Sequence, residues 1–251
     1  MSIYFILLIS TIGLPFILSF DKKLQFYKQW PYLLPSICII GAVYLLCDIY
    51  FTKLGVWGFN PLHHSGFLLL NLPLEEWLFF LIIPYASIFL HESLVLYFPN
   101  LNLSRAATKA ITIFLIIATT ILALFHLNQI YTLYISCLLI LALLLSFIDQ
   151  SKVLNHLYLT FIIILIPFIV VNGILTGTFI EEEVVWYNKN EHLGIRFLTI
   201  PIEDFGYGFS LILFNLMLTG KLKRGIKGKI KIKNHLKTGQ STLPNNHLRK
   251  A

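Results

Sequence analysis

Seven long apolar runs constrain the fold of this chain more than any other feature of its sequence. They cover approximately residues 3–20, 31–51, 66–90, 107–125, 130–148, 153–175 and 194–220. A bilayer core takes about 20 residues of helix, and lipid offers no partner to the polar groups of irregular backbone. With 57% hydrophobic and 12% charged residues, the chain is too apolar for a soluble domain. The sequence therefore predicts an all-α polytopic membrane protein with about seven transmembrane helices.

Basic residues alternate between the predicted connections and so indicate an orientation. The first, third and fifth connections carry Lys22, Lys23, Lys28, Arg105, Lys109 and Lys152, and ten of the nineteen Lys and Arg residues follow from Lys221 onward. Positively charged connections favour the cytoplasmic side. We expect a plasma (inner) membrane protein with its N-terminus outside, and a cytoplasmic tail that meets anionic lipid headgroups and not nucleic acid.

Two acidic motifs interrupt the apolar runs. Pro73-Leu74-Glu75-Glu76 in the third run returns in the seventh as Pro201-Ile202-Glu203-Asp204. Carboxylates within membrane segments are costly and usually functional, so Glu75, Glu76, Glu203 and Asp204 are the catalytic candidates. We expect each pair about two turns inside its helix, where proline either kinks the helix or begins its regular part. Adjacent acids in an apolar site are rarely both ionised, which leaves one as a proton donor.

One constant shift in residue number carries Pro73 onto Pro201, and we call it the repeat offset. The same shift relates other residues of the first half to residues of the second half. It places Asn60 on Asn188, His64 on His192 and Gly66 on Gly194. We therefore predict two three-helix repeats, residues 1–97 and 129–220, joined by a connecting helix within 98–128 and followed by a tail, 221–251. Four spans separate equivalent helices, so the repeats are parallel and bring both acidic pairs to one depth, facing one cavity.

Aromatic and polar residues cluster near both motifs. Ring faces stabilise cations, although single rings also serve in interfacial belts. The candidate substrate-binding residues are Trp57, Phe79, Phe80, Trp186, Tyr187, Phe205 and Tyr207. The residues expected to orient the acids are Asn60, His64, Asn172, Asn188, His192 and Arg196.

Several function classes lack their motifs in this sequence. It has no glycine-rich nucleotide-binding turn, no spaced histidine boxes, and no lysine before Lys221 in the last apolar run to bind retinal. The three cysteines, Cys38, Cys47 and Cys137, lack metal-ligand spacing. We expect neither a metal nor another cofactor.

The stretches GVWGFNPLHHSGFLLLNLPLEEWLFF, NGILTG, VVWYN and GIRFLTIPIEDFGYGF resemble the small membrane-type lycopene cyclases of carotenoid biosynthesis. These enzymes occur as two short subunits or, as this chain would be, as one fused chain, and the resemblance runs over residues 1–220. It implies a lycopene β-cyclase, an isomerase that closes β-ionone rings by proton-initiated cyclisation without net redox change. Implied substrates are lycopene and related linear or monocyclic carotenoids, leading to β-carotene; association with other carotenoid enzymes is compatible with this interpretation.

Within this interpretation Glu75 and Glu203 are the leading proton donor or acceptor, and Glu76 and Asp204 tune them or relay protons. Two other functions remain open: a non-enzymatic binder or proton-coupled transporter of a hydrophobic ligand, and a structural subunit for another carotenoid enzyme. The ring isomer, the number of polyene ends closed, the acid that donates the proton and the oligomeric state are not determined by the sequence.

Overall fold

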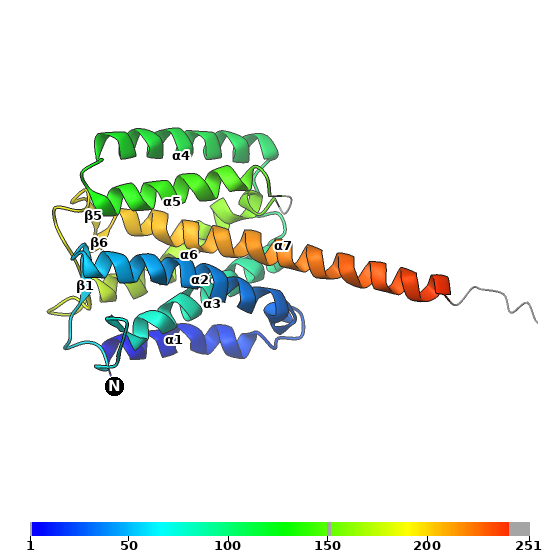
Figure 1. Ribbon diagram of the computed structural model, residues 1–251, viewed down its shortest axis with the longest axis horizontal. Helices are drawn as coiled ribbons and strands as arrows, with labels where there is room; N and C mark the ends of the chain where they lie inside the picture. The colour runs from blue at the N-terminus through cyan, green and yellow to red at the C-terminus, as the bar shows by residue number, and fades with distance from the viewer. Residues whose placement is uncertain (1, 150–151, 241–251) are drawn as a thin grey trace, which may run out of the picture.

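The computed structural model describes residues 2–149 and 152–240, with side chains as far as Ile226. The last part of the predicted tail, 241–251, lies outside the described residues. Within the described ranges, seven α-helices lie side by side and form a bundle (Figure 1). They are α1 (Ile3–Leu18), α2 (Trp30–Lys53), α3 (Leu74–Tyr97), α4 (Arg105–Phe125), α5 (Ile130–Ser146), α6 (Leu154–Leu175) and α7 (Glu203–Gln240), with a 3-10 turn η1 (Phe26–Gln29) before α2.

Three short antiparallel strand pairs close one end of the bundle, at the left in Figure 1. They are β1 (Trp57–Phe59) with β4 (Val185–Tyr187), β2 (Leu68–Leu69) with β3 (Leu72–Pro73), and β5 (Arg196–Phe197) with β6 (Ile200–Pro201). The α1–α2, α3–α4 and α5–α6 connections lie at the opposite end, where α7 also leaves the bundle. The first, third and fifth connections, which carry most of the basic residues outside the tail, therefore share one end, whereas Lys189 and Arg196 lie at the strand end.

The third and seventh apolar runs contain a hairpin before each helix, so the predicted helix starts at 66 and 194 are wrong. The β2–β3 turn has positive φ at Leu70 (51°) and Asn71 (65°), and the β5–β6 turn at Leu198 (56°). Left-handed backbone cannot continue a right-handed helix. The hairpins instead pair backbone groups between their two strands, and the Leu74 and Ile202 N–H groups donate back to the Phe67 and Ile195 carbonyls at 2.9 and 3.0 Å.

The acidic pairs consequently lie in the first turn of α3 and α7, and not two turns inside a helix as the sequence analysis predicts. Pro73 is the N-cap of α3, with φ −57° and ψ 144°. Of the two roles left open for this proline, the start of the helix is the one observed. Proline fits here because it needs no hydrogen-bond acceptor for its nitrogen.

Serine caps begin two of the helices. The Ser2 hydroxyl accepts the Phe5 N–H at 3.2 Å at the start of α1, and Ser104 accepts the Ala107 N–H at 3.2 Å at the start of α4. Such caps satisfy donors that the first helical turn leaves unpaired. Ser2 also donates its own hydrogen to the Glu75 carboxylate at 2.7 Å, which ties the start of α1 to the start of α3.

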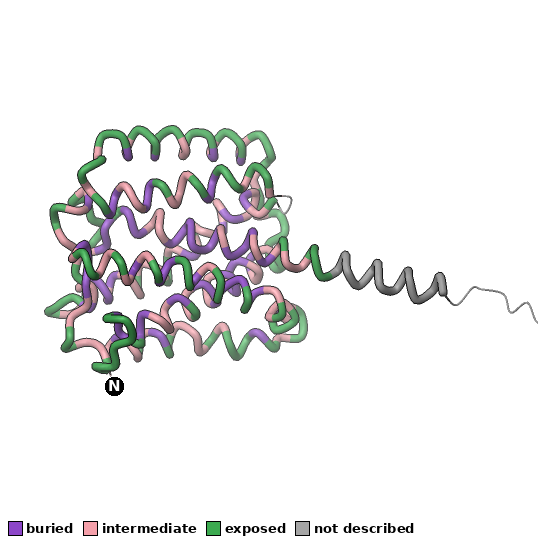
Figure 2. The backbone as a smooth tube through the Cα atoms, in the orientation of Figure 1, coloured by how far each residue is buried: buried purple, intermediate pink, exposed green. Residues whose placement is uncertain are grey.

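Five helical segments in the described residues are long and apolar enough to cross a membrane: Phe26–Lys53, Leu74–Tyr97, Arg105–Phe125, Leu154–Leu175 and Glu203–Ile226. The apolar helices α1 and α5 are shorter, with 16 and 17 residues. The outward faces carry exposed apolar side chains such as Phe114 and Ile166, and α4 in particular is exposed along much of its length (Figure 2). Several apolar helices with apolar outer faces characterise a membrane protein.

Helix α7 runs through the centre of the bundle, between α2 and α5 (Figure 1). Its residues Leu213 and Ser210 are fully buried. Ser210 shares a hydrogen bond of 2.8 Å with the Tyr44 hydroxyl of α2, and Ser36 of α2 donates to the Asn215 carbonyl at 3.0 Å. The central position of α7 brings its first turn, with Glu203 and Asp204, into the interior.

Candidate active site

The first acid of each pair is bound by the loop that precedes its hairpin. Glu75 Oε1 accepts the Ser65 backbone N–H at 2.7 Å as well as the Ser2 hydroxyl. Glu203 Oε1 accepts the Leu193 backbone N–H at 2.8 Å and the Thr132 hydroxyl at 2.7 Å. Both glutamates therefore connect a loop, a neighbouring helix start and their own helix.

The second acid of each pair is bound by tyrosine. Glu76 accepts a hydrogen bond from the Tyr4 hydroxyl of α1. Asp204 accepts one from the Tyr131 hydroxyl of α5 and another from Tyr187 at 3.1 Å. Both acids are buried. Each pair thus combines one acid bound to loop backbone with one bound only to side chains.

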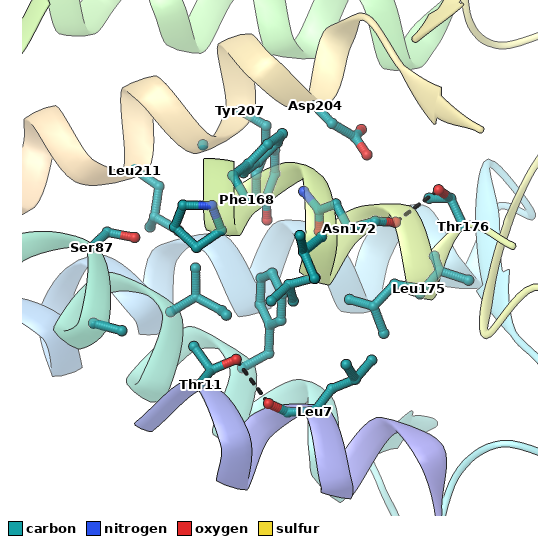
Figure 3. A pocket seen from close by; sticks show the side chains of 18 of the residues that line it. Leu7, Thr11, Ser87, Phe168, Asn172, Leu175, Thr176, Asp204, Tyr207 and Leu211 are labelled. Atoms are coloured by element: carbon teal, nitrogen blue, oxygen red, sulfur yellow. Dashed lines mark hydrogen bonds between the residues drawn. The ribbon is translucent and has the colours of Figure 1, made fainter. Parts of the chain in front are cut away.

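A cavity of about 560 Å³ lies among α1, α3, α6 and α7 (Figure 3). At the end that adjoins the strands its lining includes three carboxylates, Asp48, Glu76 and Asp204. The aromatic residues near them are Tyr4, Trp57, Phe59, Phe79, Tyr131, Tyr187 and Tyr207. Neither Glu75 nor Glu203 belongs to this lining, which otherwise consists mainly of apolar side chains.

The cavity reaches the outer surface between α1 and α6. Its lining includes Leu14 of α1, which is 65% exposed, and Val170 of α6, which is 51% exposed. Ser10 and Pro167 on the same two helices are also exposed lining residues. A hydrophobic molecule dissolved among lipid chains could reach the carboxylates by this route.

Asp48 on α2 is a site residue that the sequence analysis missed. It is 3% exposed, and Trp57 Nε1 donates a hydrogen bond to its Oδ1. A lone carboxylate within the apolar run 31–51 is itself a signal of function. Duplication does not reveal this residue, because the position related to it by the repeat offset is Thr176.

The predicted aromatic residues fall into two groups. Trp57, Phe79, Tyr187 and Tyr207 line the cavity. Phe80, Trp186 and Phe205 do not line it. Phe80 packs against Tyr207 with ring centroids 6.4 Å apart, and Phe205 packs against Phe168 with ring centroids 5.2 Å apart. Trp186 is 39% exposed. Tyr4 and Tyr131, which bind the acids, were not predicted because they stand at the starts of other helices.

The predicted asparagines and histidines mainly shape the loops. Asn60 and Asn188 accept the N–H two residues ahead, at 3.0 and 3.1 Å, and His64 and His192 do the same through Nδ1, at 3.1 and 2.9 Å. These turns present the N–H groups that hold Glu75 and Glu203. Asn172, by contrast, lines the cavity (Figure 3).

Arg196 contacts its own hairpin. Its Nη1 donates to the Thr199 carbonyl at 2.6 Å, and its Nη2 lies 3.4 Å from His192 Nε2. Burial, followed by the adjacent guanidinium, lowers the pKa of His192 below its ordinary value. The neutral imidazole that results can accept the Gly194 N–H at Nδ1.

The β1–β4 pair joins equivalent parts of the two halves. Gly58 lies opposite Trp186, its own equivalent by the repeat offset, and Trp57 and Phe59 lie opposite Tyr187 and Val185. A Cβ on Gly58 would lie 2.4 Å from the Trp186 ring, so glycine is required for this approach.

Despite three carboxylates in one cavity, the described part of the chain contains no group of three or more His, Cys, Asp or Glu side chains arranged to hold a metal ion. The lining of the cavity offers carboxyl groups, phenolic hydroxyls and aromatic faces.

A family model described as lycopene cyclase matches residues 1–94 and 128–222 of this chain. Each matched segment contains one acidic motif, and the unmatched stretch between the segments, residues 95–127, includes α4. This division is consistent with a fusion of two subunit-like copies. No curated protein and no solved structure matches the chain. Because the two matched segments together cover most of its length, the protein belongs to the lycopene cyclase family.

Proposed function

We propose that this chain is a lycopene β-cyclase that converts linear polyene ends to β-ionone rings, with β-carotene as the final product. The single observation that carries the proposal is the cavity, in which three carboxylates and several aromatic rings meet at the end of an apolar passage. Family membership supports a carotenoid substrate and an enzymatic role.

The proposed reaction is an isomerisation. A carboxylic acid transfers its proton to the terminal alkene of the polyene, which leaves a tertiary cation. The neighbouring double bond attacks this cation and closes the ring, and a carboxylate then removes a ring proton to form the ring double bond. One proton is added and one is lost, so no oxidant, reductant or leaving group is required.

The proposed roles within each pair differ from those favoured by the sequence alone. Glu76 and Asp204 line the cavity and are assigned to proton transfer. Glu75 and Glu203 accept backbone N–H groups of the loops and are outside the lining, which supports a positioning role for them. Their carboxylates would fix the helix starts from which the reacting acids project.

The aromatic rings would protect the cationic intermediate. Phe79, Tyr187 and Tyr207 line the same cavity as the acids. A ring face stabilises a nearby cation without forming a bond to it, by about 0.5–2 kcal/mol for each interaction. Apolar walls also exclude water, which would otherwise capture the cation as an alcohol.

We further propose that the chain consists of two parallel three-helix repeats, 1–97 and 129–220, with α4 as connector within 98–128 and a basic tail from 221. Support comes from the β1–β4 pairing of equivalent residues and from the equivalent bonds of Glu75 and Glu203. The proposal includes all seven apolar helices as spans, the shorter α1 and α5 among them.

The proposed location is the plasma membrane, with the strand end outside and the basic end cytoplasmic. The three connections with Lys22, Lys23, Lys28, Arg105, Lys109 and Lys152 lie at the end where α7 leaves the bundle, and positive charge favours the cytoplasmic side. The basic tail would then contact anionic headgroups, and this face would be available to other carotenoid enzymes.

The test is expression of the chain in cells that accumulate lycopene, followed by pigment chromatography. Purified protein reconstituted with lycopene in deuterated water adds a second readout: each ring formed should carry one deuterium atom from the added proton. Unchanged lycopene in both experiments, or proton flux in proteoliposomes without ring formation, would contradict the proposal in favour of a binder or transporter.

A further inference from the structure

Asp48 differs from the other two cavity carboxylates in where it comes from. Glu76 and Asp204 begin α3 and α7 at equivalent positions, whereas Asp48 lies near the end of α2. The equivalent position, just after the end of α6, is Thr176, which also lines the cavity. The Thr176 hydroxyl donates to the Asn172 carbonyl at 2.7 Å. A third carboxyl group is therefore present on one side of the cavity only.

The hydrogen bonds of Asp48 restrict where it can hold a proton. Trp57 Nε1 donates to Oδ1. An indole nitrogen has a hydrogen to donate and no lone pair to accept one, so Oδ1 must act as an acceptor. If Asp48 is protonated, its hydrogen is on Oδ2.

Oδ2 of Asp48 is buried and has no hydrogen-bond partner within the described residues. The hydroxyl of Thr52, one turn further along α2, lies near the same carboxyl group but lacks hydrogen-bond geometry to it. Oδ2 is therefore left without a donor. Buried polar atoms are normally paired, so an unpaired one in a cavity wall indicates a bound molecule or a reacting group.

The hydrogen bonds of Asp204 differ from those of Asp48. The Tyr4 hydroxyl donates to Glu76, and the Tyr131 and Tyr187 hydroxyls donate to Asp204. Hydrogen bonds that are donated to a carboxylate stabilise its charged form. Both oxygens of Asp204 accept such bonds, whereas Asp48 accepts one at Oδ1 and none at Oδ2. Asp204 is therefore better suited to accept a proton, and Asp48 is better suited to give one.

We propose that Asp48 is the acid that starts the reaction, an assignment that rests on the cyclase function proposed above. The Oδ2–H bond of Asp48 breaks as a C–H bond forms on the terminal alkene, and the resulting cation closes the ring. Glu76 or Asp204 then takes the ring proton as the new double bond forms. Release of that proton to solvent and uptake of a solvent proton by Asp48 restore the starting state.

The experiment uses the full-length chain reconstituted with lycopene, and compares Asp48→Asn with the wild type. Asparagine keeps the shape and the Oδ1 acceptor for Trp57 but cannot transfer the proton. Since general acids contribute about 10²–10⁴-fold, we expect ring formation to fall by at least about 100-fold. Lycopene that co-purifies with the protein, measured by its visible absorption, should stay unchanged.

Glu92→Gln is the matched control, because Glu92 accepts from the Gln29 side chain at 2.9 Å on the same bundle but does not line the cavity. It should retain ring formation. Ring formation by Asp48→Asn at a rate near that of the wild type would overturn the inference. Loss of bound lycopene in parallel with activity would overturn it as well, because the role would then be structural. Failure of the wild type to form rings would instead contradict the proposed function itself.

Discussion

Gly58 and Trp186 face each other in the β1–β4 pair although they belong to opposite halves of the chain. The indole ring covers the position where a side chain at residue 58 would begin. The two halves of the chain therefore meet at a point that tolerates only glycine, directly beside the cavity residues Trp57 and Tyr187.

The first prediction concerns this contact. Gly58→Ala should destabilise the protein by about 1–3 kcal/mol, because its Cβ would lie 2.4 Å from the Trp186 ring and force a shift. Thermal unfolding in detergent measures the effect. Gly13→Ala is the control, since no neighbouring atom lies within 4 Å of a Cβ there. The double variant Gly58→Ala, Trp186→Ala should recover part of the loss; equal effects of the variants at 58 and 13 would contradict the prediction.

The second prediction separates the two acids of each pair. Glu76→Gln and Asp204→Asn should each lower the rate of ring formation by about 10²–10⁴-fold, as expected for groups that transfer protons. Glu75→Gln and Glu203→Gln should mainly lower the unfolding temperature, because they weaken charged hydrogen bonds to loop N–H groups, at a cost of about 1–3 kcal/mol. Rates are measured per folded protein. Full stability with lost activity in Glu75→Gln would argue that Glu75 reacts directly.

The third prediction concerns the tyrosines that bind the reacting acids. Tyr131→Phe removes one of two hydroxyls that donate to Asp204, and Tyr4→Phe removes the hydroxyl that donates to Glu76. Since Tyr187 remains for Asp204, we expect Tyr131→Phe to slow ring formation less than Tyr4→Phe does. Single-turnover conversion of bound lycopene measures both. The opposite order would show that the residual Tyr187 bond, at 3.1 Å, does not support Asp204.

The fourth prediction concerns pH and His192. Its pKa is lowered in the folded protein by burial and by Arg196, so the unfolded chain binds a proton more readily. Stability from this residue should be complete above its unfolded pKa of about 6.5 and should be lost as pH falls through the lower folded value. Unfolding temperatures across this range test it. In Arg196→Gln the loss should be smaller, because one cause of the shift is removed.

The fifth prediction tests access through the opening between α1 and α6. Val170→Trp should reduce kcat/KM for lycopene supplied in lipid vesicles, because the larger side chain fills an exposed part of the cavity wall. Ile166→Trp is the control, since Ile166 is 66% exposed on the same helix but does not line the cavity. Equal kinetics for the two variants would place the access route elsewhere.

Much of the fold follows from patterns along the sequence. The apolar runs predict the helices, and the repeat offset relates Gly66 to Gly194, both of which have positive φ in the structure (85° and 74°). The hairpins could not be predicted, because residues 66–73 are as apolar as a helix and their turn is made by Leu70 and Asn71 without glycine. Hydrophobicity reports burial in lipid or protein, and not the backbone conformation.

The site was only partly predictable for a related reason. Duplication identifies acids that occur twice, so it finds Glu76 and Asp204 but not Asp48, whose counterpart is Thr176. Nor can the sequence tell which acid of an adjacent pair faces a cavity. That choice depends on loop N–H groups, such as that of Ser65, which become available only after the hairpin forms.

The acids occupy one end of the cavity only, and this bears on how a molecule with two identical ends would be processed. Along α3 the lining runs from Glu76 to Leu90, a distance of about 21 Å. Under the proposed function, a polyene inserted from the apolar side presents one terminus to the carboxylates while its other terminus stays remote from them. The second ring then requires withdrawal, reversal and reinsertion, which makes the monocyclic carotenoid a released intermediate that competes with lycopene for the same passage.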